Sequence, residues 1–462
     1  MKTLFWFKQD LRLSDNQGLC EAVKAGSVLP IYIHDPGHPS LGAANRIWLH
    51  HSLKSLNLSL KGKLAIFKGS PLELIKQLVK QHNIQRVYWN QGYEPWQISQ
   101  EKELKAQIEK EVEVQVCSSF LLWEPGEILK SDGTPFKVFS PYYKRGCLLA
   151  DPPKAPIAPP SKLDLISVKD DGLDFLNLLP KVRWDRNVLK HWKIGEKPAW
   201  EKFQTFLSKG LRYYKEGRDF PAQNAVSRLS PHLHFGEISP HQIWSVVNSL
   251  KQDHNTCSFL SELGWREFSY YLLYHFPTLP TQNFQSKFDH FPWKWDSPHL
   301  KQWQTGTTGF PIVDAGMREL WQTGYMHNRV RMIVASFLVK NLLLHWQIGL
   351  EWFENHLLDA DLASNSASWQ WVAGSGADAA PYFRIFNPIT QGEKFDPEGE
   401  YTRHYVPELK KLPNKYLFCP WDATKDVLTQ AGIELGKTYP KPIIDLKQSR
   451  EEALQAFDQI KG

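Results

Sequence analysis

The chain has few cysteines, no long apolar run and no cleavable leader. Its five cysteines are scattered and odd in number, and none forms a C-x-x-C pair, so the sequence predicts neither a disulfide framework nor a zinc site. The longest uncharged apolar run, around "MIVASFLV", is too short to span a bilayer. The N-terminus "MKTLFWFKQDLRL" lacks the small-residue cleavage site of a signal peptide. These absences predict a soluble, cytoplasmic protein with no membrane partner.

Positively charged residues only slightly outnumber negatively charged ones. Lysine and arginine number 55 against 49 acidic residues, which gives a net charge of +6. This balance permits a nucleic-acid-binding face, but the chain has no strong basic run and no groove-reading module, which argues against a non-catalytic DNA-binding protein. Tryptophan, by contrast, is abundant at 19 residues. Such an excess can serve a large core, a surface on which bases stack, or a redox route.

The first 130 residues alternate between strand and helix patterns. The runs with strand character are "TLFWF", "VLPIYIH", "LAIFKG", "QRVYWNQ" and "VEVQVCSS". Helical patterns such as "PLELIKQLVKQHN" lie between them, and this alternation predicts a doubly wound, parallel α/β domain over residues 1–130. No G-x-G-x-x-G follows the first strand run, so an ordinary dinucleotide fingerprint is excluded.

The rest of the chain has a different character. Residues 131–195 are rich in proline ("DPPKAPIAPPSK") and predict an interdomain linker. From residue 196 to 462 helical periods dominate, as in "AWEKFQTFLSKGLRYYKEG", and few alternating β-branched runs occur. The predicted fold class is therefore an α/β domain followed by an all-α domain.

Four short motifs contain the residues that are best suited to binding or catalysis. In "VSRLSPHLHFGEISP", Ser230 is predicted to cap a helix whose first residue is Pro231. The start of that helix is either an anion pocket for a cofactor pyrophosphate or simply a capped end. In "SELGWREF", Glu262, Trp265 and Arg266 share one helix face. That face suits a nucleobase with a nearby phosphate, or it is an ion pair beside a core tryptophan.

The other two motifs combine acids, amides and aromatic side chains. In "MHNRVRM", Asn328 and Arg331 share a helix face, and an inward-pointing Arg331 would need a carboxylate such as Asp359 or Asp361. In "DADLASNSASWQW", Asn365 lies midway between Asp361 and Trp369 at a spacing of four residues, so one helical stripe could carry all three. No third acid or histidine supports a metal at the two aspartates, and no metal site is predicted.

In this order, the motifs resemble those of the photolyase/cryptochrome family. The resemblance extends from "LFWFKQDLRLSDN" through "WREF", "TGFPIVDAGMREL" and "SFLVKNLLLHW" to "WQWVAGSGADAAPYFRIFNPITQGEKFD", and it covers the whole chain. The amino-acid sequence of the last segment is most similar to that of bacterial cyclobutane-pyrimidine-dimer (CPD) photolyases of class I/III type. The family implies an α/β antenna domain and an α-helical domain that binds FAD and DNA.

The resemblance also implies a function. It predicts a deoxyribodipyrimidine photo-lyase, a monomeric enzyme that splits pyrimidine dimers in UV-damaged DNA by electron transfer from photoexcited reduced FAD. The dimer would be flipped out of the duplex, which is easier because it pairs poorly. The neutral amide of Asn365 would favour the fully reduced, anionic flavin. Methenyltetrahydrofolate is the predicted antenna chromophore, with a deazaflavin or no antenna as alternatives.

The family assigns roles to individual residues. Residues implied to bind the cofactor are Tyr214, Val226, Ser227, Arg228, Leu229, Ser230, Arg331, Asp359, Asp361 and Asn365. Those implied to act in catalysis or electron transfer are Glu262, Asn328 and Met332, together with the chain Trp369, Trp346 and Trp295. Those implied to contact DNA are Arg218, Glu262, Trp265, Arg266, Asn328, Arg329, Trp371, Arg384 and Gln391. Val226 stands where the family often has threonine, and Trp293 is an alternative to Trp295.

Two relatives within the family remain as alternatives. A cryptochrome, which is a blue-light receptor, has the same fold, but Asn365 and the set Glu262, Asn328 and Met332 favour repair. A (6-4) photolyase typically has a histidine where this chain has Asn328.

Overall fold

The structure is a computed structural model that describes residues 1–37, 41–379 and 383–461. It forms two compact units, each made of segments that are not contiguous in sequence. Unit 1 consists of Met1–Arg212, Ser227–Pro277 and Leu358–Ala363, and unit 2 of Tyr213–Val226, Thr278–Leu357 and Ser364–Gly462. The domain boundaries at residues 130 and 195 stay a prediction.

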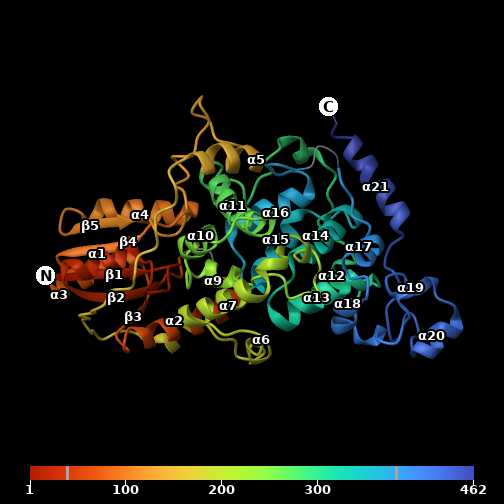
Figure 1. Cartoon of the computed structure of the whole chain (residues 1–462), viewed down its shortest axis with the longest axis horizontal. Coiled ribbons are helices and arrows are strands. Elements are labelled where there is room, and N and C mark those ends of the chain that lie inside the picture. The colour runs from red at the N-terminus through yellow and green to blue at the C-terminus, as the bar shows by residue number, and fades with distance from the viewer. Residues whose placement is uncertain (38–40, 380–382, 462) are drawn as a thin grey trace. The chain divides into compact units, whose positions relative to one another are not determined.

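Unit 1 contains a parallel five-stranded sheet in the order β3-β2-β1-β4-β5 (Figure 1). The strands are β1 (Lys2–Phe7), β2 (Ser27–His34), β3 (Ala65–Lys68), β4 (Arg86–Asn90) and β5 (Glu113–Cys117). A helix connects each strand to the next, as parallel pairing requires. These helices are α1 (Gln17–Ala25), α2 (Ala43–Ser59), α3 (Pro71–His82) and α4 (Pro95–Ile108). All five predicted strands are confirmed.

The core of this sheet explains why its strands were visible in the sequence. Leu4 and Trp6 of β1 pack with Ile31 of β2 and Trp89 of β4, and all four side chains are buried. Parallel strands covered on both faces read as continuous apolar runs. The predicted α/β class is confirmed.

The remaining elements are helical. From residue 196 onward this was predicted, whereas the short helices between residues 139 and 189 lie in the stretch that was predicted to be an interdomain linker. The further helices of unit 1 are α5 (Phe139–Pro141), η1 (Tyr142–Gly146), η2 (Cys147–Leu149), η3 (Leu173–Leu176), α6 (Asp185–Leu189), α7 (Glu196–Lys209), α9 (Ser230–His234), α10 (Pro240–Ser249) and α11 (His254–His275). Beyond Cys117, the described residues form isolated β-bridges but no further strand. None of the helices in the described ranges has both the length and the hydrophobicity that a bilayer crossing needs.

Unit 2 is built almost entirely from helices (Figure 1). They include α8 (Tyr214–Gly217), η5 (Ser286–His290), α12 (Leu300–Thr305), α13 (Pro311–Thr323), α14 (Asn328–Ser336), η6 (Phe337–Asn341), α15 (Trp346–His356), α16 (Leu362–Ala373), α17 (Pro388–Phe395), α18 (Glu400–Tyr405), η7 (Pro407–Leu409), α19 (Asn414–Leu417), η8 (Pro420–Asp422), α20 (Lys425–Ala431) and α21 (Leu446–Asp458). The first two residues of α16 belong to unit 1. The short η4 (Leu211–Tyr213) joins α7 to α8.

A buried polar network fixes helix α9 within unit 1. Glu237 accepts from the indole N–H of Trp48 at 3.2 Å, and its other oxygen lies 2.5 Å from Nδ1 of His232. Gly236 has φ +67°, and a Cβ there would come within 2.1 Å of the Gln9 carbonyl oxygen. The turn after α9 therefore needs glycine because the chain approaches Gln9 so closely.

Candidate functional site

The loop that leads into α9 contains four of the predicted cofactor residues of unit 1, from Ser227 to Ser230. Arg228 has a left-handed backbone (φ +52°), which is uncommon for a non-glycine residue. The prediction that Ser230 caps α9 is wrong: Leu229 precedes the helix, and no side chain caps it. The Ser230 hydroxyl instead donates to the carboxylate of Asp359 at 2.5 Å. The loop is thus tied to a segment far away in the sequence.

Two cations lie against one tryptophan next to this loop. The Arg228 guanidinium carbon lies 4.9 Å, and the Lys202 ammonium nitrogen 5.1 Å, from the centre of the Trp192 ring. Burial, helped by the charge of Arg228, lowers the pKa of Lys202 to about 8. Both cations contact the same ring, and an anion such as the predicted cofactor pyrophosphate would offset the repulsion between them.

Asp361 accepts a hydrogen bond from a tyrosine that the sequence analysis did not select. The hydroxyl of Tyr270 donates to the Asp361 carboxylate, and Nδ1 of His234 lies 3.5 Å from the same oxygen. Burial and the charge of Asp361 raise the pKa of Tyr270 well above 10, so the phenol keeps its proton. Asp359 and Asp361 are both only 8 % exposed.

Helix α11 presents the predicted lesion-binding face of unit 1. Glu262 and Trp265 are half-buried, and Trp265 stacks on Phe139 with a centroid distance of 3.8 Å. Arg266 is directed elsewhere, since its guanidinium donates to Glu267 at 2.8 Å. Burial raises the pKa of Glu267 to about 7, although the adjacent Arg266 opposes the shift. Arg266 therefore has a structural partner, and its contact with DNA stays a prediction.

Helix α14 presents the corresponding face of unit 2. Asn328 begins the helix and is exposed, while Arg331 and Met332 are half-buried. Arg329 forms an ion pair with Asp219 at 2.8 Å. Nε of Arg331 donates to the backbone carbonyl of residue 326 at 2.8 Å. The predicted pair of Arg331 with Asp359 stays a prediction.

Three further predicted residues of unit 2 lie on or after α8. The guanidinium carbon of Arg218 lies 5.6 Å from the ring centre of Tyr214, and Tyr214 is buried. Val226 is half-buried and ends this segment of unit 2. Their roles at FAD and DNA stay predictions.

The side chain of Asn365 is held by two acceptors. Its Nδ2 donates to the Leu350 carbonyl at 3.2 Å and to the Glu354 carboxylate at 3.3 Å. Both hydrogen bonds use the amide nitrogen, so they assign the orientation of this buried amide.

Two of the three predicted redox tryptophans of unit 2 are buried, and the third is exposed. Trp369 and Trp346 are 2 % and 0 % exposed, whereas Trp295 is 63 % exposed. The ring of Trp295 stacks on His345 at 4.2 Å, and His345 lies 5.4 Å from Trp346. The set thus combines two buried indoles with one at the surface, as a route from a buried cofactor to solvent would need.

Gly349 of α15 lies directly against Trp369. A Cβ at this position would come within 2.1 Å of the indole. We therefore expect Gly349→Ala to displace Trp369, to destabilise the protein by about 1–3 kcal/mol and to slow flavin photoreduction. Thermal unfolding and blue-light bleaching of the flavin check both effects. The matched control is Gly432→Ala, because no atom lies within 4 Å of a Cβ added there. Its φ of +74° adds backbone strain but no contact with Trp369. An equal loss of photoreduction in both variants would contradict the assigned role of Trp369.

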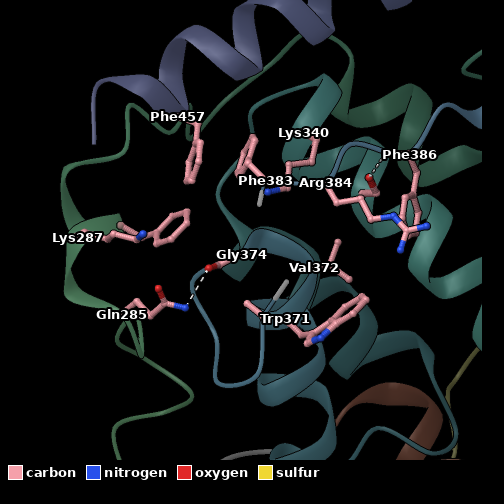
Figure 2. A pocket seen from close by; sticks show the side chains of 13 residues that line it. Gln285, Lys287, Lys340, Trp371, Val372, Gly374, Phe383, Arg384, Phe386 and Phe457 are labelled. Atoms are coloured by element: carbon pink, nitrogen blue, oxygen red, sulfur yellow. Dashed lines mark hydrogen bonds between the residues drawn. The ribbon is translucent and has the colours of Figure 1, made fainter. Parts of the chain in front are cut away.

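Trp371 and Arg384 line a pocket of about 270 Å³ in unit 2 (Figure 2). Lys287 and Lys340 also line it, and none of the lining residues that the structure describes carries a carboxylate. Lys340 is buried and donates to the Ala373 carbonyl at 2.6 Å, whereas Lys287 and Arg384 are exposed. Its other lining residues are Gln285, Phe288, Ser336, Val372, Gly374, Ala379, Phe383, Phe386 and Phe457.

The pocket combines exposed cations with aromatic walls, a chemistry that suits a nucleic-acid strand. Gln391, the last predicted DNA contact, is half-buried on α17.

The sequence analysis missed three residues that the structure places at these sites. His345 bridges two predicted redox tryptophans, Gly349 supports the third, and Tyr270 binds Asp361. Only Gly349 had a usable signal, because a glycine inside a helical pattern often marks close packing.

Comparisons with known proteins identify the family. Residues 3–161 match the model described as DNA photolyase, and residues 259–459 match the FAD binding domain of DNA photolyase. The chain is 47% identical over 469 residues to a deoxyribodipyrimidine photo-lyase of Agrobacterium fabrum, covering 99% of this chain and 98% of that one.

The chain belongs to the photolyase/cryptochrome family. Its fold is also similar to the crystal structure of a bacterial class III photolyase from Agrobacterium tumefaciens, with a TM-score of 0.97, 46% identity and coverage of 100% of this chain and 98% of that chain. Cryptochrome-2 of Arabidopsis thaliana is 37% identical and matches 100% of this chain and 79% of its own length. Photolyases and cryptochromes are thus both among the relatives of this family member.

Proposed function

We propose that the protein is a light-dependent DNA repair enzyme, a deoxyribodipyrimidine photo-lyase that splits cyclobutane pyrimidine dimers with photoexcited reduced FAD. The observation that carries this proposal is the 47% identity, over almost the full length, to a protein of that name. The placement of the predicted residues is consistent with it, because each unit carries part of the set in surroundings that suit the assigned chemistry.

FAD supplies the light-driven electron when it is bound. In unit 1, Ser227, Arg228 and Leu229 would bind its phosphates, and the adjacent Lys202 adds a second cation. Ser230 holds Asp359 in place through its hydroxyl, and Tyr270 does the same for Asp361. These hydrogen bonds help to orient the two carboxylates.

The residues proposed for the lesion contribute hydrogen bonds and walls. The half-buried carboxyl of Glu262 would hydrogen-bond the dimer, and Asn328 can both donate to and accept from a pyrimidine edge. Met332 provides a polarisable contact, while Trp265 and Trp371 supply faces for stacking. Arg218, Arg329, Arg384 and Gln391 would hold the DNA backbone.

Selective binding in the dark tests this assignment without any electron transfer. The FAD-loaded protein should bind an oligonucleotide containing one thymine dimer at least about tenfold more tightly than the undamaged strand, since a dimer costs less to flip out. Titration by fluorescence anisotropy at fixed salt measures the ratio. Equal affinities would argue for a receptor rather than a repair enzyme.

The side chain at position 365 is expected to set the redox state in which photoreduction ends. Asn365→Asp would place a second carboxylate beside Glu354, and like charges this close raise the pKa of one of them. The resulting carboxylic acid can protonate the flavin, so photoreduction should stop at the one-electron level. Absorption spectra during illumination check this.

The control for that substitution is Asn355→Asp. Asn355 is an exposed amide on α15 whose Nδ2 donates to the Glu351 backbone carbonyl at 3.0 Å, so its replacement should leave the spectra unchanged. Identical spectra for Asn365→Asp and the parent protein would show that Asn365 does not act on the flavin.

Three finer assignments complete the proposal. Methenyltetrahydrofolate is the proposed antenna, and the enzyme is proposed to act as a cytoplasmic monomer. The second candidate function is that of a cryptochrome-type blue-light receptor, which the 37% identity to Cryptochrome-2 favours.

A further inference from the structure

Two buried tyrosines of unit 1 each donate their phenolic proton to a carboxylate. The hydroxyl of Tyr270 donates to Asp361, and that of Tyr93 donates to Glu124 at 2.7 Å. Both rings are only 1 % exposed. Burial, followed by the charge of the adjacent carboxylate, raises the pKa of each phenol well above 10. Each phenol therefore keeps its proton in the ground state and has an acceptor ready for it.

The two phenol rings lie close enough to exchange an electron. Their centroids are 6.5 Å apart, and Phe120 packs against both, at 6.0 Å from Tyr93 and 5.1 Å from Tyr270. Glu124, the carboxylate at the Tyr93 end, is half-buried rather than fully buried and can exchange its proton with solvent.

A nearby cation determines how Tyr270 can be oxidised. The guanidinium carbon of Arg266 lies 5.2 Å from the Tyr270 ring centre. A positive charge near the ring is attracted to the neutral phenol but repels a phenol radical cation. The guanidinium therefore disfavours the radical cation. Oxidation is therefore favourable only if the phenolic proton leaves with the electron, and Asp361 is positioned to accept it.

We propose that Tyr270 and Tyr93 form a second, proton-coupled route that supplies electrons to the photoexcited flavin, in addition to the tryptophan chain. This rests on the proposed function, because it requires bound FAD at Asp361. In the first step, one electron leaves Tyr270 for the photoexcited oxidised flavin, and the O–H bond of Tyr270 breaks as its proton moves to Asp361.

In the second step, one electron passes from Tyr93 to the Tyr270 radical. Asp361 returns its proton to Tyr270, and the phenolic proton of Tyr93 moves to Glu124. The net change is one electron transferred from Tyr93 to the flavin and one proton gained by Glu124. An added thiol then reduces the Tyr93 radical and restores the phenol.

Transient absorption and electron paramagnetic resonance on the FAD-loaded protein test this route. The experiment uses a Trp369→Phe background, in which the tryptophan chain is interrupted. A blue flash should produce a neutral tyrosyl radical, and its formation should slow in D₂O because a proton moves with the electron. Tyr270→Phe should abolish the signal, whereas Tyr271→Phe should preserve it.

Tyr271 is the matched control because it is the next residue on α11 and is equally buried. Its hydroxyl accepts a hydrogen bond from the backbone N–H of Phe136 and has no carboxylate partner among the described residues. Glu124→Gln provides a second test that leaves Tyr270 and Asp361 intact. It should shorten the radical lifetime about tenfold, which corresponds to about 1.4 kcal/mol in the barrier to recombination.

The outcomes separate this inference from the proposed function. A tyrosyl signal that survives in Tyr270→Phe, or a flavin that is photoreduced with no tyrosyl signal in the Trp369→Phe background, would overturn the route while leaving the enzyme assignment intact. A lifetime unchanged in Glu124→Gln would limit the route to Tyr270 and overturn the relay. Protein that binds no flavin would overturn both.

Discussion

Glu262→Gln should lower the rate of dimer repair by about tenfold to a hundredfold, because a hydrogen bond to a charged group contributes about 1.5–3 kcal/mol. The carboxyl of Glu262 is half-buried on the same face of α11 as Trp265. The dimer gains an electron during the reaction, so a hydrogen bond to it strengthens as charge develops. Repair under saturating blue light, measured with chemically reduced enzyme, gives the ratio.

A second glutamate on the same helix provides the control for this substitution. Glu267 is buried and holds Arg266 and the backbone N–H of Leu122. Glu267→Gln should therefore lower the melting temperature and can weaken DNA binding only through Arg266, but it should leave the repair rate per bound dimer unchanged. If Glu262→Gln alters stability and not repair, the assigned role of Glu262 is wrong.

Trp369→Phe should slow photoreduction of the oxidised flavin by at least about tenfold, because a phenyl ring is much harder to oxidise than an indole. An increase of about 1.4 kcal/mol in the activation barrier is enough to lower the rate tenfold. Trp369 is 2 % exposed and is the first member of the predicted chain Trp369, Trp346 and Trp295, of which Trp295 is 63 % exposed. Repair by enzyme that has been reduced chemically should be unaffected, since the electron that splits the dimer does not come from Trp369.

Trp303→Phe is the matched control for this prediction. Trp303 is also fully buried and contacts Trp369 edge-on at 6.5 Å, but its indole N–H is directed to the Val334 carbonyl. Its replacement removes an indole without interrupting the series towards Trp295. Equal losses of photoreduction in the two variants would show that packing around the flavin, rather than electron donation by Trp369, was disturbed.

Much of the fold could be predicted because its elements are locally encoded. Strands such as β1 and β4 are buried on both faces, so they appear in the sequence as short apolar runs between helical patterns. The helical second half was equally visible from its periodicity. The two units could not be predicted, because each joins segments that are distant in sequence: residues 358–363 belong with the first half of the chain.

The site was predictable at the level of residue types, but its pairings were not. The family resemblance implied that Asp361 lies near the cofactor, yet its partner Tyr270 lies 91 residues away. Ser230 was predicted to cap its own helix, and its hydroxyl instead reaches Asp359, 129 residues further along the chain. Hydrogen bonds across such separations depend on tertiary packing, which helix-cap preferences do not include.

The most direct test of the proposed function is blue-light repair of an oligonucleotide that contains one thymine dimer. The purified, photoreduced protein should restore the absorbance of the intact thymines under blue light, and it should do nothing in the dark. A protein that binds FAD and is photoreduced, yet leaves the dimer intact under illumination, would contradict the assignment as a CPD photolyase and favour a cryptochrome-type receptor.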